Sequence, residues 1–139
     1  MKNKKRQHGF TLIELLVVLT ILALLAALVV PRVFRNLDKA KTNTTKAQIS
    51  AFESALGAYR LDVGAFPTTD QGLQALRSRP AGVENWDGPY LPKELPLDAW
   101  GHPYVYRCPS EHGDYEIISY GADGREGGEG VDADIVSWK

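Results

Sequence analysis

The feature that most constrains this 139-residue chain is an apolar run from Phe10 to Val30 that holds one charge, Glu14. As a helix these 21 residues would be about 31 Å long, close to the hydrocarbon thickness of a bilayer. The run therefore predicts a membrane-spanning helix. A charge at the centre of such a helix costs about 2.5–3.5 kcal/mol, so we expect Glu14 to have a partner. Cleavage after Gly9 would create a positive amine on Phe10, one helical turn from Glu14 or beside the Glu14 of a neighbouring chain.

The charges around this run predict its orientation. Basic residues precede it at Lys2, Lys4, Lys5 and Arg6. The positive-inside rule then places the N-terminus in the cytoplasm and the rest of the chain across the membrane, in a bacterial periplasm. Removal of residues 1–9 would leave 12 basic and 17 acidic residues, a net charge of −5. This balance argues against a nucleic-acid partner, which would call for a basic patch.

Helical spacing continues beyond the span. Pro31 should kink the helix rather than end it, whereas Gly64 and Pro67 should stop it, so we expect one helix from about Phe10 to Leu61. Its first part, residues 10–30, is the membrane segment, and residues 31–61 are an amphipathic continuation that must pack on something. The apolar stripe of that continuation is predicted to comprise Leu37, Ala40, Thr44, Ala47, Ala51, Ala55 and Tyr59, with Phe52 and Leu56 alongside.

Residues 62–139 are predicted to form one small soluble domain. Residues 71–78 resemble a short helix, with Asp70 among its candidate caps, and residues 80–103 hold too many prolines and glycines for regular structure. Strands are expected from Tyr104 to Cys108, from Tyr115 to Tyr120 and from Ile135 to Trp138, the first two as a hairpin. The predicted fold class is α+β, with the long helix packed on a small antiparallel sheet.

Between the last two strands, residues 120–135 form a loop rich in carboxylates and glycines. Its acidic residues are Asp123, Glu126, Glu129, Asp132 and Asp134. Carboxylates and backbone carbonyls suit calcium, which accepts 6 to 8 oxygen ligands in flexible geometry. Zinc is a poor fit because no cysteine or histidine is near. An acidic, solvated turn explains the same composition, so the residues alone leave both interpretations open.

Cys108 is the only cysteine of the chain. No intramolecular disulfide can therefore form, although the predicted compartment is oxidising. We interpret Cys108 as a small apolar side chain packed in a strand.

The segment Gly9-Phe10-Thr11-Leu12-Ile13-Glu14, behind its basic leader, resembles the start of type IV pilins and pseudopilins. The resemblance implies that a prepilin peptidase cuts after Gly9 and methylates the amine of Phe10, and that Glu14 serves assembly. A secretory signal peptide would need a shorter apolar core and an earlier small-residue cleavage site. A plain membrane anchor would not need Glu14.

A second resemblance covers nearly the whole chain. The runs Pro96 to Tyr106, Ser119 to Gly124 and Gly127 to Ile135 are similar to the major pseudopilins of type II secretion systems, the general secretion pathway protein G family. It implies a calcium site in the loop. Its implied ligands are the side chains of Asp123, Asp132 and Asp134 and the backbone carbonyls of Tyr120, Arg125 and Gly128. The chain departs from the family pattern at Leu97-Asp98-Ala99-Trp100, where Asp-Pro-Trp is more usual, and at Cys108.

The function implied is that of a non-enzymatic structural subunit. Held first in the inner membrane, it would join a homo-oligomeric helical filament in the periplasm, together with minor pseudopilins and the assembly platform, and drive export of folded proteins. One alternative is a type IV pilin for adhesion, motility or DNA uptake. The other is a membrane-tethered periplasmic hydrolase, which the lack of a Gly-x-Ser-x-Gly motif disfavours.

Processing gives the first testable prediction. Gly9→Val should leave the leader attached, because the implied peptidase site has no room for a side chain, while insertion into the membrane should be unchanged. Mass spectrometry of the wild-type protein should find an N-methylated Phe10 as the first residue. A mature wild-type N-terminus at any other position would contradict the pilin-type interpretation.

Overall fold

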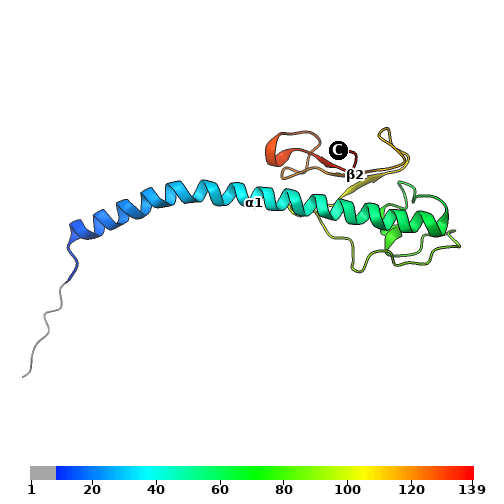
Figure 1. Ribbon diagram of the computed structural model, residues 1–139, viewed down its shortest axis with the longest axis horizontal. Coiled ribbons are helices and arrows are strands. Elements are labelled where there is room, and N and C mark those ends of the chain that lie inside the picture. Colours follow the sequence, from blue (N-terminus) through cyan, green and yellow to red (C-terminus); the bar gives the residue numbers. More distant parts are fainter. Residues whose placement is uncertain (1–8) are drawn as a thin grey trace, which may run out of the picture. The chain divides into compact units, whose positions relative to one another are not determined.

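The computed structural model describes residues 9–139, and the basic leader residues Lys2, Lys4, Lys5 and Arg6 lie outside this range. Helix α1 runs from Leu12 to Val63 with Pro31 inside it, close to the predicted helix from Phe10 to Leu61 (Figure 1). Contacts divide the chain into two compact units, the second of which extends from Asp38 to Lys139. The helix thus contributes its C-terminal half to the domain.

The N-terminal half of α1 is apolar and exposed. By length and composition α1 is the one helix, within residues 9–139, that could cross a membrane, and the rest of the described chain buries none of its most apolar 18-residue stretch. Large side chains such as Leu12 and Leu28 are 88% and 71% exposed. Such a continuous apolar surface calls for lipid or other protein chains around it.

The C-terminal half of α1 supplies one face of the domain core. The buried residues of the helix are Thr45, Ile49, Phe52, Ala55, Leu56 and Tyr59. The predicted stripe was therefore mostly wrong: of its seven residues only Ala55 and Tyr59 are buried, while Leu37, Ala40, Thr44, Ala47 and Ala51 are exposed. The large side chains of Ile49, Phe52, Leu56 and Tyr59 recur at helical spacing on one face, and they bury more apolar area than the alanines could.

A small antiparallel sheet faces this part of the helix. It consists of β1 (Val105–Arg107), β2 (Glu116–Ser119) and β3 (Ile135–Val136), in the order β1-β2-β3. The register pairs Tyr106 with Ile117 and Ser119 with Ile135. Tyr106, Ile117 and Ile135 enter the same apolar core as the helix. The predicted α+β class and the predicted hairpin are confirmed, with strands shorter than the sequence indicated.

The chain between the helix and the sheet is largely irregular, as predicted. Its one element is the 3-10 helix η1 (Leu73–Leu76), shorter than the helix expected at 71–78. Asp70 does not cap it, since no side chain caps η1. Instead, Thr68 and Gln71 each accept a side-chain hydrogen bond from the other's backbone N–H, at 3.3 and 2.9 Å. This reciprocal pair closes a turn before η1 begins.

Cys108 follows β1 directly and packs, half-buried, against the apolar core. Its backbone N–H and carbonyl both bond the hydroxyl of Thr69, at 2.9 and 3.1 Å. The environment is that of a packing residue, as predicted, but Cys108 lies just outside the strand in which it was expected.

The core generates the second prediction. Leu56 is fully buried and Leu61, on the same helix, is 87% exposed. Leu56→Ala should lower the free energy of unfolding of the domain by about 2–5 kcal/mol, because it leaves a cavity. The matched control Leu61→Ala should change it by about 0.5 kcal/mol or less. Urea unfolding followed by tryptophan fluorescence measures both, and equal losses in the two variants would show that the core lies elsewhere.

Candidate functional site

The start of α1 is closed by a reciprocal pair of hydrogen bonds. The backbone N–H of Thr11 donates to Oε2 of Glu14 at 3.0 Å, and the backbone N–H of Glu14 donates to Oγ1 of Thr11 at 3.2 Å. This is a capping box, which satisfies two amides that the first helical turn leaves free. Glu14, predicted only as an assembly charge, therefore also stabilises the helix start. The Thr-x-x-Glu spacing is the sequence signal that could have shown it.

The two predicted processing residues precede the capping box. Phe10 is 88% exposed, and nothing within 4 Å surrounds the position where a side chain on Gly9 would begin. Neither residue belongs to α1, which begins at Leu12. The peptide bond between them therefore lies outside the helix, between two exposed residues.

The acidic loop joins β2 to β3 and contains the 3-10 helix η2 (Gly130–Asp132). One backbone bond crosses it, from the N–H of Ala122 to the carbonyl of Val131, at 2.9 Å. Two carboxylates bond backbone N–H groups within it. Oδ1 of Asp123 accepts from Arg125 at 3.0 Å, and Oδ2 of Asp134 accepts from Gly127 at 2.9 Å.

Glycines allow the loop backbone to pack closely around Asp132. A Cβ on Gly128 would lie 2.5 Å from the carbonyl oxygen of Asp132, and a Cβ on Gly121 would lie 2.9 Å from the same atom. Both glycines also have positive φ, +90° and +66°. A side chain at either position would force the backbone of Asp132 away.

The structure brings some of the predicted ligands together and keeps others apart. Gly128 contacts Asp132, and Arg125 bonds Asp123. Within residues 9–139, however, no three carboxylate, histidine or cysteine side chains are placed to hold one metal ion, so Asp123, Asp132 and Asp134 do not converge as a group. Tyr120 follows β2, and its hydroxyl lies 3.4 Å from Nη2 of Arg107.

One atom of the loop fits a cation. Oδ1 of Asp134 is inaccessible to solvent and has no hydrogen-bond partner in the described part of the chain. A carboxylate oxygen buried without a partner is costly, and a bound cation would remove that cost. The predicted ligands are all oxygen donors, as calcium prefers. A site with fewer than three carboxylates would take its other ligands from backbone carbonyls.

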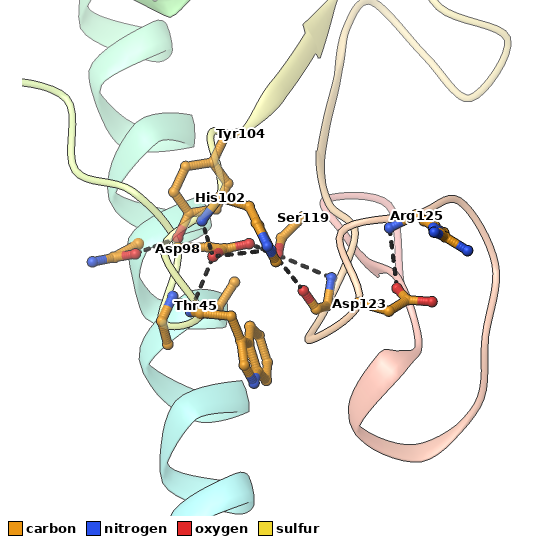
Figure 2. Close-up of polar contacts among 11 residues, drawn as sticks. Thr45, Asp98, His102, Tyr104, Ser119, Asp123 and Arg125 are labelled. Atoms are coloured by element: carbon orange, nitrogen blue, oxygen red, sulfur yellow. Dashed lines mark hydrogen bonds and ion pairs between the residues drawn. The ribbon is translucent and has the colours of Figure 1, made fainter.

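The loop is attached to the domain through a buried carboxylate, Asp98, which Figure 2 shows between α1 and the loop. Its Oδ1 accepts from the backbone N–H groups of Trp100 and His102, at 3.0 and 2.9 Å. Its Oδ2 accepts from the hydroxyl of Ser119 on β2 at 2.6 Å. The side chain is fully buried, and these three donors replace the water that it lost.

Asp98 also positions the turn against α1. The next residue, Ala99, donates its backbone N–H to Oγ1 of Thr45 on the helix, at 3.3 Å. Beside it, the hydroxyl of Tyr104 bonds Oε1 of Gln48, and burial raises the pKa of Tyr104 to about 12. We call the carboxylate of Asp98, with Thr45, His102 and Ser119, the Asp98 hub. Sequence reasoning noted Asp98 only as a departure from a family pattern; an acidic residue inside an apolar and proline-rich run was the available signal.

The two histidines after the leader have structural contacts. Nδ1 of His102 lies 3.1 Å from the carbonyl of Gly121, and Nδ1 of His112 lies 2.9 Å from Oε2 of Glu116. The His112 ring stacks on Trp138 at 3.8 Å. The hydrogen bond from His112, helped by Arg107 at 2.9 Å, holds the pKa of Glu116 below its ordinary value. Within residues 9–139, neither imidazole ring is hydrogen-bonded to a serine, threonine or cysteine side chain, as the ring of a hydrolase base would be.

Comparison with known proteins gives two family matches. The model for type II secretion system protein G matches residues 32–138, and the prokaryotic N-terminal methylation motif matches residues 4–30. The core protein G of Pseudomonas aeruginosa is 48% identical over 139 residues, covering 98% of each chain. That of Vibrio cholerae is 46% identical over 141 residues, covering 99% of this chain and 96% of its own.

A solved structure agrees with these matches. The crystal structure of the major pseudopilin from the type 2 secretion system of enterohaemorrhagic Escherichia coli superposes with a TM-score of 0.64 at 41% identity, covering 74% of this chain and 90% of its own. The fold, the N-terminal motif and the match along most of the chain agree. The chain belongs to the type II secretion system protein G family.

Proposed function

We propose that this chain is the major structural subunit of a periplasmic pseudopilus, a filament that drives export of folded proteins across the outer membrane. The observation that carries the proposal is the match to protein G of type II secretion systems over residues 32–138, together with the methylation motif that precedes it. The exposed apolar half of α1 supplies the surface that neighbouring subunits would cover. The export itself would need an energy source outside this chain.

Before assembly the subunit would be held in the inner membrane by one helix, with its domain in the periplasm. The length and apolar character of the N-terminal half of α1 support this location. Prepilin peptidase would cut between Gly9 and Phe10 and methylate Phe10. Minor pseudopilins and the assembly platform would then be its partners, besides further copies of the chain.

We assign Glu14 the role of guiding an incoming subunit. Buried among apolar helices, its carboxylate would pair with the methylated amine of Phe10 on a neighbouring subunit, because an unpaired charge there is costly. The capping box holds this carboxylate at the start of α1, where it can do so.

The third prediction separates the charge of Glu14 from its capping role. Glu14→Gln keeps an acceptor for the Thr11 amide but removes the charge, so the chain should remain in the membrane while filament assembly and secretion fail. Thr11→Ala is the matched control, because it removes the cap's hydroxyl and keeps the charge; it should assemble. Expression without wild-type copies, followed by electron microscopy and a secretion assay, measures both. Normal assembly of Glu14→Gln would refute the charge pair.

We further propose that the acidic loop binds calcium. The ligands would be drawn from the carboxylates of Asp123, Asp132 and Asp134, which would have to move closer together on binding, and from the carbonyls of Tyr120, Arg125 and Gly128. The buried, unpartnered Oδ1 of Asp134 supports a cation at this place, and the glycines of the loop let its backbone pack closely enough to share the coordination. Calcium would offset the repulsion between the loop's carboxylates and stabilise this small domain.

The fourth prediction tests the metal. In detergent-purified full-length chain, calcium at a hundredfold excess over Kd should raise the free energy of unfolding by about 2.7 kcal/mol. Magnesium should substitute poorly, because it demands octahedral geometry and releases its water reluctantly. Asp123→Ala should abolish the response, whereas Glu129→Ala, which removes an equal charge from the same loop, should retain it. An equal melting temperature in calcium and in chelator would leave the loop as an acidic turn.

A further inference from the structure

Two contacts of His102 with the acidic loop indicate that this residue supports the loop. Its Nδ1 lies 3.1 Å from the carbonyl oxygen of Gly121, and a carbonyl oxygen only accepts, so Nδ1 carries the proton. Its ring also lies against Gly124, where a Cβ would be 3.1 Å from Cε1 and Nε2 of the imidazole. These two glycines flank Ala122 and Asp123. His102 therefore contacts the loop on both sides of a predicted ligand.

We propose that His102 is a positioning residue, whose Nδ1–H fixes the 121–124 segment and so pre-orients Asp123 for the cation. The inference rests on the proposed calcium site. The imidazole would not touch the metal, and its effect would pass through the carbonyl of Gly121. A loop that is already ordered loses less conformational entropy when it binds, and this raises its affinity.

The Asp98 hub makes His102 a fixed support. The backbone N–H of His102 donates to Oδ1 of Asp98 at 2.9 Å. The backbone N–H of Trp100 and the hydroxyl of Ser119 donate to the same buried carboxylate. Oδ1 of Asp98 also lies 4.0 Å from Nδ1 of His102, too far for a hydrogen bond, so Nδ1 is left to the carbonyl of Gly121. Backbone and ring of His102 are therefore oriented by the core of the domain (Figure 2).

Gly121 transmits this position to the other end of the loop. If Gly121 had a side chain, its Cβ would lie 2.8 Å from the carbonyl carbon of Asp132 and 2.9 Å from the carbonyl oxygen of Ala133. Next to Gly121, the hydrogen bond from the backbone N–H of Ala122 to the carbonyl of Val131 closes the loop. A hydrogen bond from His102 to Gly121 thus holds the segment on which both Asp123 and Asp132 depend.

The fifth prediction uses a matched pair of amides. In Asn the side-chain N–H₂ can occupy the place of the histidine Nδ1, whereas in Gln it reaches the place of Nε2. His102→Asn should therefore keep the bond to Gly121 and bind calcium within about twofold of wild type. His102→Gln should bind roughly 3- to 10-fold more weakly, the loss expected for one hydrogen bond. Isothermal titration of detergent-purified full-length chain with calcium chloride measures both.

A second variant and a second measurement distinguish positioning from loss of stability. Tyr90→Phe removes a hydroxyl that bonds Asp62 at 2.8 Å and accepts from Asp87 at 3.0 Å, so it should lower stability without changing calcium affinity. In chelator, the amides of residues 121–124 should exchange hydrogen faster in His102→Gln than in His102→Asn or Tyr90→Phe. Exchange needs no metal, so it still tests His102 if wild type binds no calcium and the proposed site fails. Equal affinity of Asn and Gln variants in a calcium-binding chain, or equal exchange in all three, would overturn the inference.

Discussion

The domain depends on one apolar contact, that between the C-terminal half of α1 and the three-stranded sheet. Phe52, Leu56 and Tyr59 on the helix meet Tyr106 and Ile117 on the strands, and all are buried. Burial of each large apolar side chain stabilises a fold by about 1.5–3 kcal/mol, more than the net contribution of about 0.5–1.5 kcal/mol from one hydrogen bond in the sheet. The irregular chain between helix and sheet needs little regular structure of its own, since Leu73, Leu76 and Leu91 pack into the same core.

The parts of the molecule with strong periodicity were the ones that the sequence predicted. The long helix, its Pro31 and the hairpin from β1 to β2 all follow from spacing and turn residues. The buried face of α1 was misplaced because small residues such as Ala47 fit a helical stripe as well as Ile49 does, and only packing decides between them. The cap of the 71–78 segment was misassigned for a related reason: Thr68, Asp70 and Gln71 all have capping side chains, and the tertiary turn selects among them.

In the candidate site, too, the sequence predicts some features and tertiary contacts decide the others. Its composition is visible in the sequence, and so is the position of the loop between two strands. What fixes the loop is long-range: Asp98 is 21 residues from Ser119, and His102 is 19 residues from Gly121. No local sequence pattern indicates such long-range pairs. A buried carboxylate that joins a turn to a strand also explains how a domain with short strands can hold an irregular loop, because each of its hydrogen bonds would leave a costly unpaired group if broken.

The capping box at the start of α1 lies wholly after the predicted cut. Thr11 keeps its amide N–H whether Gly9 is still attached to Phe10 or has been removed, and both bonds to Glu14 are made by atoms that stay with the chain. The precursor and the mature subunit would therefore begin their helix at the same residue, with the same first turn. Maturation would change the charge next to an already folded helix end, and the new amine would meet a carboxylate whose place had been set in advance.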